Sequence, residues 1–409
     1  MSRIFQTIGA NPNNLGWFFL LPPLAGLIVQ PIIGYYSDRT WAPKLGGRRL
    51  PYLLIGMVIA VIVMILLPNS GSFGFGYGSL AALWFGAITV AFLDLSSNMA
   101  MQPFKMMVGD MVNDDQKSYA YGIQSLICNT GAVLAAIFPF LLTWWGISNT
   151  AKKGVVPQSV VISFYVGAVI LVITCLFTIF RVHEYDPATY ARYHGISEED
   201  NKKGGNWFTL LKHAPRVFWN VALVQFFCWF SFQYLSTYAV GAIAKNVWLT
   251  TDASSAAYQA AGNWYGVMTA VQSIAAVVWS YVLAKVPNNH HKAGYAFSLL
   301  LGAVGYTSIF FIHSQNALIF SFVLIGIAWA SMNTYPLTMV TNALSGKHMG
   351  TYLGLFNGSI CVPQMVASLL SFGLFPLLGS SQVNMMLVTG ISALLGAISV
   401  LFIKETYQA

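Results

Sequence analysis

The chain alternates long apolar runs with short polar segments over nearly its whole length. Only 8% of its 409 residues are charged, whereas 56% are hydrophobic. An ordinary soluble domain carries about 25% charged residues, so a water-soluble fold of this length could not cover its surface with so few. A lipid bilayer can host such a surface, because lipid-facing helices need no polar coating. The chain is therefore expected to be an all-α membrane protein.

Eleven apolar runs are long enough to cross about 30 Å of hydrocarbon as helices. They cover residues 15–36, 51–68, 78–102, 118–143, 159–180, 216–242, 259–284, 294–313, 317–341, 349–375 and 384–403. The longest polar stretch, about 181–215, mixes both signs of charge and separates five runs from six. These features predict a first half at 1–180, a linker at 181–215 and a second half at 216–409.

The basic residues indicate the orientation of the chain. The segments between the runs fall into two alternating sets, and one set holds sixteen of the 20 Lys and Arg residues. The other set holds Arg3, Lys152, Lys153 and Lys245. Basic residues collect on the cytoplasmic side, so the chain is expected to begin outside and to end inside. The net charge of +8 does not indicate nucleic-acid binding, since these residues are not gathered on one face.

The sequence carries none of the motifs expected of an enzyme or a metalloprotein. Its four cysteines all lie in apolar runs without CxxC spacing, and its histidines lack metal-ligand spacing. It contains no GxxxxGK[ST] phosphate-binding loop, no HExxH and no nucleophile elbow. We therefore expect no enzymatic activity, no bound metal or cofactor, and no drive from ATP.

Asp94 is the one acidic residue among twelve that lies in the middle of an apolar run. A charged Asp at this depth costs about 2.5–3.5 kcal/mol on insertion scales. Burial disfavours the ionised form of a carboxyl group, so Asp94 is expected to gain and lose a proton near neutral pH. This behaviour is what proton coupling requires. The alternative is a neutral Asp that only forms a hydrogen bond between helices.

Amide side chains form stripes on several of the predicted helices. Asn98 and Gln102 follow Asp94 at four-residue spacing and so share its helix face. Further members of the stripes are Gln225, Trp229, Gln233, Asn333, Asn357 and Gln364. Amides and an aromatic ring suit sugar hydroxyls, so these residues are expected to line a polar cavity between the halves. The alternative for each single amide is a structural hydrogen bond between helices.

The loop after the first run has a pattern of glycines and charges. It contains Gly34, Asp38 and Arg39, followed by Arg48 and Arg49. The glycine allows close helix approach, and the arginines keep their charge and stay at the cytoplasmic face. This pattern predicts a gating latch between the halves. The alternative is a simple basic anchor at the membrane surface.

This loop resembles the signature of the major facilitator superfamily. The stretches 38–52 and 94–104, together with Gly354-Leu-Phe-Asn357 and Pro363-Gln364, look like its branch of sucrose carriers and glycoside–cation symporters. The resemblance implies a major facilitator fold of two pseudo-symmetric halves. It aligns Met1 to Asn14 with the outer end of the first helix, which implies a twelve-helix fold that lacks this helix. In the family, an acidic residue in the helix of Asp94 is associated with proton-coupled sugar uptake.

Taken together, the residues and the resemblance predict a proton-coupled symporter for a small neutral sugar such as sucrose, maltose or another glycoside. Its partners are expected to be the sugar, a proton and the lipid bilayer, with the chain acting as a monomer in the cell membrane and its C-terminus in the cytoplasm. Two alternatives stay open: a sodium-coupled or efflux carrier of the same fold, and a truncated membrane protein that does not transport.

Overall fold

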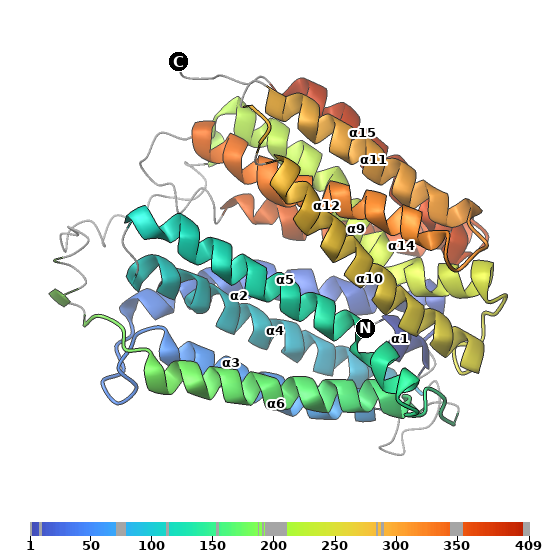
Figure 1. Cartoon of the computed structure of the whole chain (residues 1–409), viewed down its shortest axis with the longest axis horizontal. Coiled ribbons are helices and arrows are strands. Elements are labelled where there is room, and N and C mark those ends of the chain that lie inside the picture. The colour runs from blue at the N-terminus through green and yellow to red at the C-terminus, as the bar shows by residue number, and fades with distance from the viewer. Residues whose placement is uncertain are drawn as a thin grey trace.

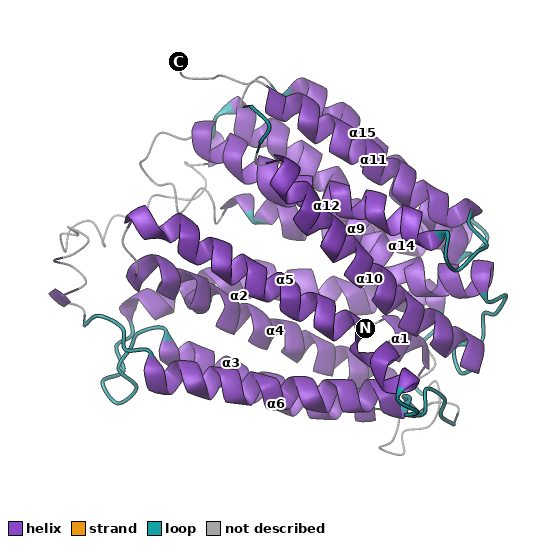
Figure 2. Ribbon diagram, in the orientation of Figure 1, coloured by secondary structure: helices purple, strands orange, loops and turns teal. Residues whose placement is uncertain are grey.

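The chain folds into two groups of long helices that lie side by side (Figure 1). A computed structural model describes residues 2–7, 10–70, 79–111, 114–152, 155–186, 188–189, 192, 211–283, 285–287, 290–343 and 355–403. Within these ranges the structure is helical and contains no strand, as Figure 2 shows; the only β-type pairing there is an isolated bridge between Ala42 and Gly47. The predicted all-α fold is confirmed.

Long helices account for most of the described residues. The first group contains α2 Leu15–Arg39, α3 Leu50–Leu66, α4 Leu80–Met111, α5 Asp114–Trp144 and α6 Gln158–Arg181. The second contains α9 Arg216–Val247, α10 Ala256–Leu283, α11 His291–Phe311, α12 Leu318–Ala343, α14 Gly358–Leu377 and α15 Gln382–Ser399. The short elements are α1 Ser2–Thr7, η1 Pro12–Asn14, η2 Leu67–Asn69 and η4 Val400–Phe402.

The exact number of spans differs from the prediction. Ten of the described helices are long and apolar enough to cross a membrane, so the predicted count of eleven is not confirmed. The exception is α9, in which polar residues such as Gln225, Ser231 and Gln233 interrupt the apolar sequence. Residues 349–354 of the run predicted at 349–375 lie outside the described part, and the helix α14 begins at Gly358, with Asn357 at its N-cap.

The two groups of helices pack in different ways. In the second, α9 runs between its neighbours, packs along α15 and α14, and has most of its C-terminal part buried. In the first, α4 packs on α2 and α3, and α3 packs on α6. The groups meet where α14 lies against α2 and where α10 lies against α5. The predicted halves 1–180 and 216–409, with their linker, stay a prediction.

Burial is uneven between the groups. In α12 and α15, 56% of the residues in each apolar stretch are buried, compared with 17% in Gln158–Arg181 and 6% in Ile127–Trp144. The buried cluster confined to the first group is small and consists of Leu50, Met57, Met107, Cys175 and Ile179. The larger core therefore belongs to the second group and to its junction with the first. The expectation that the first helix of the fold is lacking stays a prediction.

Close helix contacts in the second group depend on glycine. A Cβ atom placed on Gly305 of α11 would lie 2.7 Å from the carbonyl oxygen of Ser321 and 2.9 Å from Cβ of Leu324, both on α12. Carbonyl groups of a helix cannot move aside without disturbing its hydrogen bonds. The absence of a side chain at this position therefore sets the distance between α11 and α12.

We expect Gly305→Ala to lower the midpoint of thermal unfolding in detergent, because overpacking a close contact costs about 1–3 kcal/mol. Gly373→Ala on α14 is the matched control, since a Cβ there would meet nothing within 4 Å. The control is expected to leave the midpoint unchanged or raise it slightly, because Ala favours a helix over Gly by about 0.5–1 kcal/mol. Equal effects of the two substitutions would contradict this account.

Candidate functional site

Asp94 lies near the middle of α4, with its side chain half-buried. The amide of Asn98, one turn further along, donates to the backbone carbonyl of Asp94 over 2.8 Å. Within the part of the chain that the structure describes, no hydrogen bond or ion pair reaches the Asp94 carboxylate. A carboxylate in this position is chemically available to a proton or to a bound solute.

Gly26 marks the place where helices of both groups approach this region. A Cβ atom on Gly26 of α2 would lie 3.6 Å from Nδ2 of Asn98 on α4 and 3.7 Å from Sγ of Cys361 on α14. The amide of Asn357 in turn contacts the Cys361 sulfur at 3.8 Å. The predicted site residues Asn98 and Asn357 therefore lie close to the same point, where α2 passes between the two groups.

An aromatic cluster lies on the second group of helices. The rings of Trp229 and Phe232, three residues apart on α9, pack against Trp329 of α12 with centroid distances of 5.6 Å and 4.5 Å. Asn333 is exposed and donates to the carbonyl of Trp329 over 2.7 Å. The indole N–H of Trp229 is buried and has no hydrogen-bond partner within the described ranges. The cluster thus offers aromatic surface and one unused donor.

Gln225 and Gln233 of α9 face into the packed helices. Gln225 is 3% exposed and donates to the carbonyl of Met332 on α12 over 3.0 Å. Gln233 is 5% exposed and donates at 2.9 Å both to the carbonyl of Phe19 on α2 and to the hydroxyl of Ser368 on α14. In this structure both side chains join helices, and their predicted role in binding a solute stays a prediction.

The remaining predicted binding residues are placed less fully. Gln364 is half-buried on α14, and the side chain of Gln102 lies outside the described part of the structure. The sequence analysis did not include Phe232 or Trp329 among the site residues. The i, i+3 spacing of Trp229 and Phe232 was the available signal for a shared aromatic face.

Of the predicted latch residues, the structure describes the side chains of Arg48 and Arg49 only. Gly34, Asp38 and Arg39 belong to the last turns of α2, but their side chains lie outside the described part. Arg49 is buried, 2% exposed, and its guanidinium donates to the hydroxyl of Ser37 over 2.7 Å. The cation therefore lies near the C-terminal end of α2, where the helix dipole favours a positive charge.

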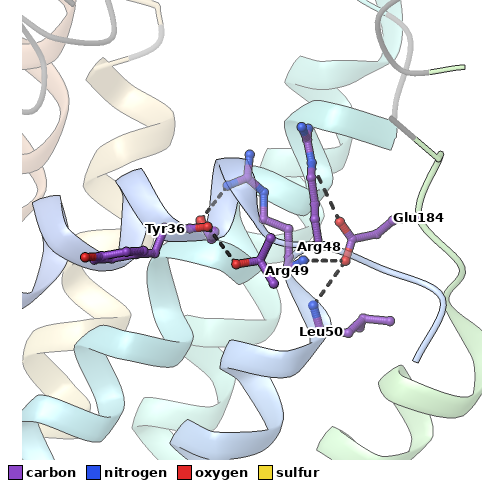
Figure 3. A network of polar contacts seen from close by, with 7 residues as sticks. Tyr36, Arg48, Arg49, Leu50 and Glu184 are labelled. Carbon is purple, nitrogen blue, oxygen red and sulfur yellow. Dashed lines mark hydrogen bonds and ion pairs between the residues drawn. The ribbon is translucent and has the colours of Figure 1, made fainter. Parts of the chain in front are cut away.

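Glu184, in the segment that follows α6, binds the loop at residues 49 and 50. Its carboxylate oxygen Oε1 accepts from the backbone N–H groups of Arg49, at 2.9 Å, and Leu50, at 3.1 Å (Figure 3). Its other oxygen lies 4.0 Å from Nε of Arg48. A carboxylate at the first turn of α3 satisfies donors that the helix leaves unpaired. Sequence reasoning counted Glu184 only among the linker charges, because nothing local shows that it returns to residue 49.

Glycine makes room for this contact. A Cβ atom on Gly47 would overlap the Glu184 carboxylate, and Gly46 has a positive φ of 68° with its carbonyl accepting from the Glu184 N–H at 2.9 Å. The contacts described here join α2, α3 and the end of α6, all in the first group of helices. A latch that joins the two halves stays a prediction.

The fold and these sites define a multi-pass helical membrane protein with polar residues where its two helix groups meet. The sequence model of the Major Facilitator Superfamily matches residues 1–368, and the chain belongs to this superfamily. It is accordingly a membrane transporter and not an enzyme.

Relatives and structural neighbours agree with this assignment. The sucrose transport protein SUC4 of Arabidopsis thaliana is 23% identical over 384 residues, which cover 86% of this chain and 75% of that protein. The sucrose transport protein SUT5 of Oryza sativa subsp. indica is 23% identical over 427 residues, covering 90% of this chain and 77% of that protein. The solved structure of the nucleoside transporter NupG has a TM-score of 0.70 at 11% identity and covers 98% of this chain and 93% of its own. A D-xylose-proton symporter has a TM-score of 0.66 at 14% identity, covering 96% and 88%.

We expect Glu184→Ala to reduce the free energy of unfolding by about 2–3 kcal/mol, because it leaves two helix-terminal N–H groups and nearby arginines without their carboxylate. Glu184→Gln keeps an acceptor oxygen and is expected to lose less. Thermal unfolding in detergent measures both, with Asp186→Asn as an exposed acidic control. An unchanged midpoint for Glu184→Ala would mean that the carboxylate does not hold this loop.

Proposed function

We propose that this protein is a proton-coupled symporter that carries a small neutral sugar, such as sucrose, maltose or another glycoside, by alternating access. The observation that carries the proposal is Asp94, an acidic side chain that lies half-buried in the middle of the apolar helix α4. Two relatives, SUC4 and SUT5, are named sucrose transport proteins, which supports sugar as the solute. A structural neighbour is a D-xylose-proton symporter, which supports proton coupling on this fold.

The chemistry around Asp94 favours an uncharged solute. Asn98, one turn from Asp94, lies near Gly26 together with the thiol of Cys361, which contacts the amide of Asn357 where α2, α4 and α14 meet. Amides both donate and accept, which matches hydroxyl groups that do the same. A second ionised group would be needed to neutralise an ionic solute in such an environment. The other acidic residues of the sequence lie in loops, at helix ends or in the tail.

The aromatic cluster supplies the second half of the proposed binding site. Trp229, Phe232 and Trp329 present ring faces and edges, and the C–H faces of a sugar ring pack well on such surfaces. The indole N–H of Trp229 remains free to donate to a sugar hydroxyl. Asn333 and Gln364 are the further amides that we place in this site, together with Gln102, Gln225 and Gln233 after a change of conformation.

Proton coupling follows from two access states. With the site open to the side of higher proton activity, Asp94 takes up a proton and becomes neutral, which removes the penalty of a buried charge while the halves rearrange. A protonated carboxyl can also donate to a sugar hydroxyl. Once the site opens to the other side, the proton leaves and the ionised group hydrates, so the sugar and the proton cross together.

The arrangement in the membrane is part of the proposal. We place the protein in the cell membrane as a monomer with its C-terminus in the cytoplasm, because sixteen basic residues fall in segments on that side. The loop of Arg48 and Arg49 then lies at the cytoplasmic end. There, with Gly34, Asp38 and Arg39, it would act as the gating latch between the halves.

We expect Asp94→Asn to abolish sugar accumulation driven by a pH gradient in proteoliposomes, because the amide cannot bind and release a proton. The same variant is expected to retain sugar counterflow, which needs no net proton movement. Asp252→Asn, in an exposed loop, is the control and should keep both activities. Accumulation by Asp94→Asn at the level of the wild type would remove Asp94 from the coupling mechanism, and dependence on sodium instead of pH would favour a sodium-coupled carrier.

A further inference from the structure

A polar network joins the two groups of helices at the end of the bundle where α1 lies. This end is opposite the loop of residues 40–49, and in the orientation proposed above it is the outer end. Figure 1 shows α1 in this region, next to the ends of α5 and α10. The network does not involve Asp94 or the aromatic cluster, so its role does not depend on the identity of the solute.

Arg3 of α1 is the centre of this network. Its Nε donates to Oε1 of Gln259 over 2.6 Å, and Nη1 donates to Oδ1 of Asn263 over 2.7 Å, both on α10. Its Nη2 donates to Oδ1 of Asn149, in the segment between α5 and α6, over 2.8 Å. One side chain thus joins the short helix α1 to the segment between α5 and α6 in the first group and to α10 in the second.

The two acceptors on α10 are built into the protein. Gln259 is 1% exposed and Asn263 is 5% exposed. Gln259 also donates to the hydroxyl of Thr7, while Asn263 donates to the hydroxyl of Thr143 at the end of α5 over 2.9 Å. Each amide therefore presents its oxygen to Arg3 because its nitrogen is held elsewhere.

Gly262 provides the space that Arg3 occupies. A Cβ atom on Gly262 of α10 would lie 2.6 Å from Cδ and 2.9 Å from Nε of Arg3. Any larger residue would push the arginine out of its position between Gln259 and Asn263. A second crossing contact lies nearby, where Gln382 at the start of α15 donates to Gln6 over 3.0 Å.

The cation has neutral partners at this site. The described structure contains no carboxylate paired with Arg3, and its three acceptors are all amide oxygens. Removal from water lowers the pKa of Arg3 to about 10, which still leaves the guanidinium charged at neutral pH. Bonds from a guanidinium to amides can be exchanged for bonds to water more readily than a buried ion pair can be separated.

We propose that Arg3 is a gating residue that closes the outer end of the transporter by donating across the two helix groups to Gln259 and Asn263. Opening of this end moves α10 away from the segment of Asn149, so Arg3 can no longer reach all three acceptors and water replaces those that it loses. The contact to Asn149 is the link of Arg3 to the first group. Since neither arginine nor amide titrates near neutral pH, the contact itself keeps its charge and its acceptors between about pH 5 and 8.

The test is a distance measurement between spin labels on the full-length protein in liposomes, without sugar or pH gradient. Labels are placed at Trp145→Cys, after α5, and Leu377→Cys, at the end of α14, which are 63% and 82% exposed. Cys128→Ala removes the one exposed native cysteine, and the other three are buried. We expect Arg3→Ala to raise the fraction of long label distances several-fold over the wild type.

Two further variants keep the test decisive. Gly262→Ala displaces Arg3 without removing its charge, and Ala is favourable in a helix, so it is expected to fold and to raise the long-distance fraction as well. Lys152→Ala removes an exposed cation at the same end and should leave the distances unchanged.

The proposal is overturned if Gly262→Ala and folded Arg3→Ala both keep the wild-type distance distribution, or if Lys152→Ala shifts it as much as they do. Because the measurement uses no solute, its failure would leave the sugar–proton proposal untouched. Conversely, a protein that carries no sugar could still show the expected effect of Arg3.

Discussion

Inside an apolar helix bundle a buried polar group without a partner is costly, and this cost favours polar side chains that join helices. The amide nitrogens of Gln225 and Gln233 donate to helix carbonyls and, in the case of Gln233, to a serine hydroxyl, and they hold α9 against α12, α2 and α14. Asp94 is different, since its carboxylate has no partner in the described part of the chain. An ionisable side chain in the middle of a membrane helix is costly for packing and therefore marks a candidate functional site.

Charged residues at the two ends of the bundle solve the same problem in different ways. Near residue 49, the Arg49 guanidinium lies at the end of α2 and the Glu184 carboxylate caps the start of α3, so each charge meets a helix end of opposite polarity. At the other end, Arg3 is surrounded by neutral amides. The first arrangement stabilises a loop within one group of helices, and the second joins the two groups with bonds that water can replace.

Much of the fold could be predicted from the sequence, because an apolar run of about 20 residues has few alternatives to a membrane-crossing helix. The face shared by Asp94 and Asn98 also follows from four-residue spacing. Spacing within one helix does not show which other helix a given face packs against. For this reason Gln225 and Gln233 were expected to line a cavity, whereas in the structure their side chains form hydrogen bonds between helices. The role of Glu184 depends on a contact with Arg49, which lies 135 residues earlier in the sequence, and no local sequence pattern predicts such a contact.

The central claim is that a neutral sugar and a proton cross the membrane together through the site around Asp94. The most direct test is to record the internal pH of proteoliposomes that contain the purified protein when sucrose, maltose or another glycoside is added outside, with no other gradient present. The account predicts that a transported sugar acidifies the lumen and that a proton ionophore abolishes the signal. Uptake of the sugar without any change in internal pH would contradict it.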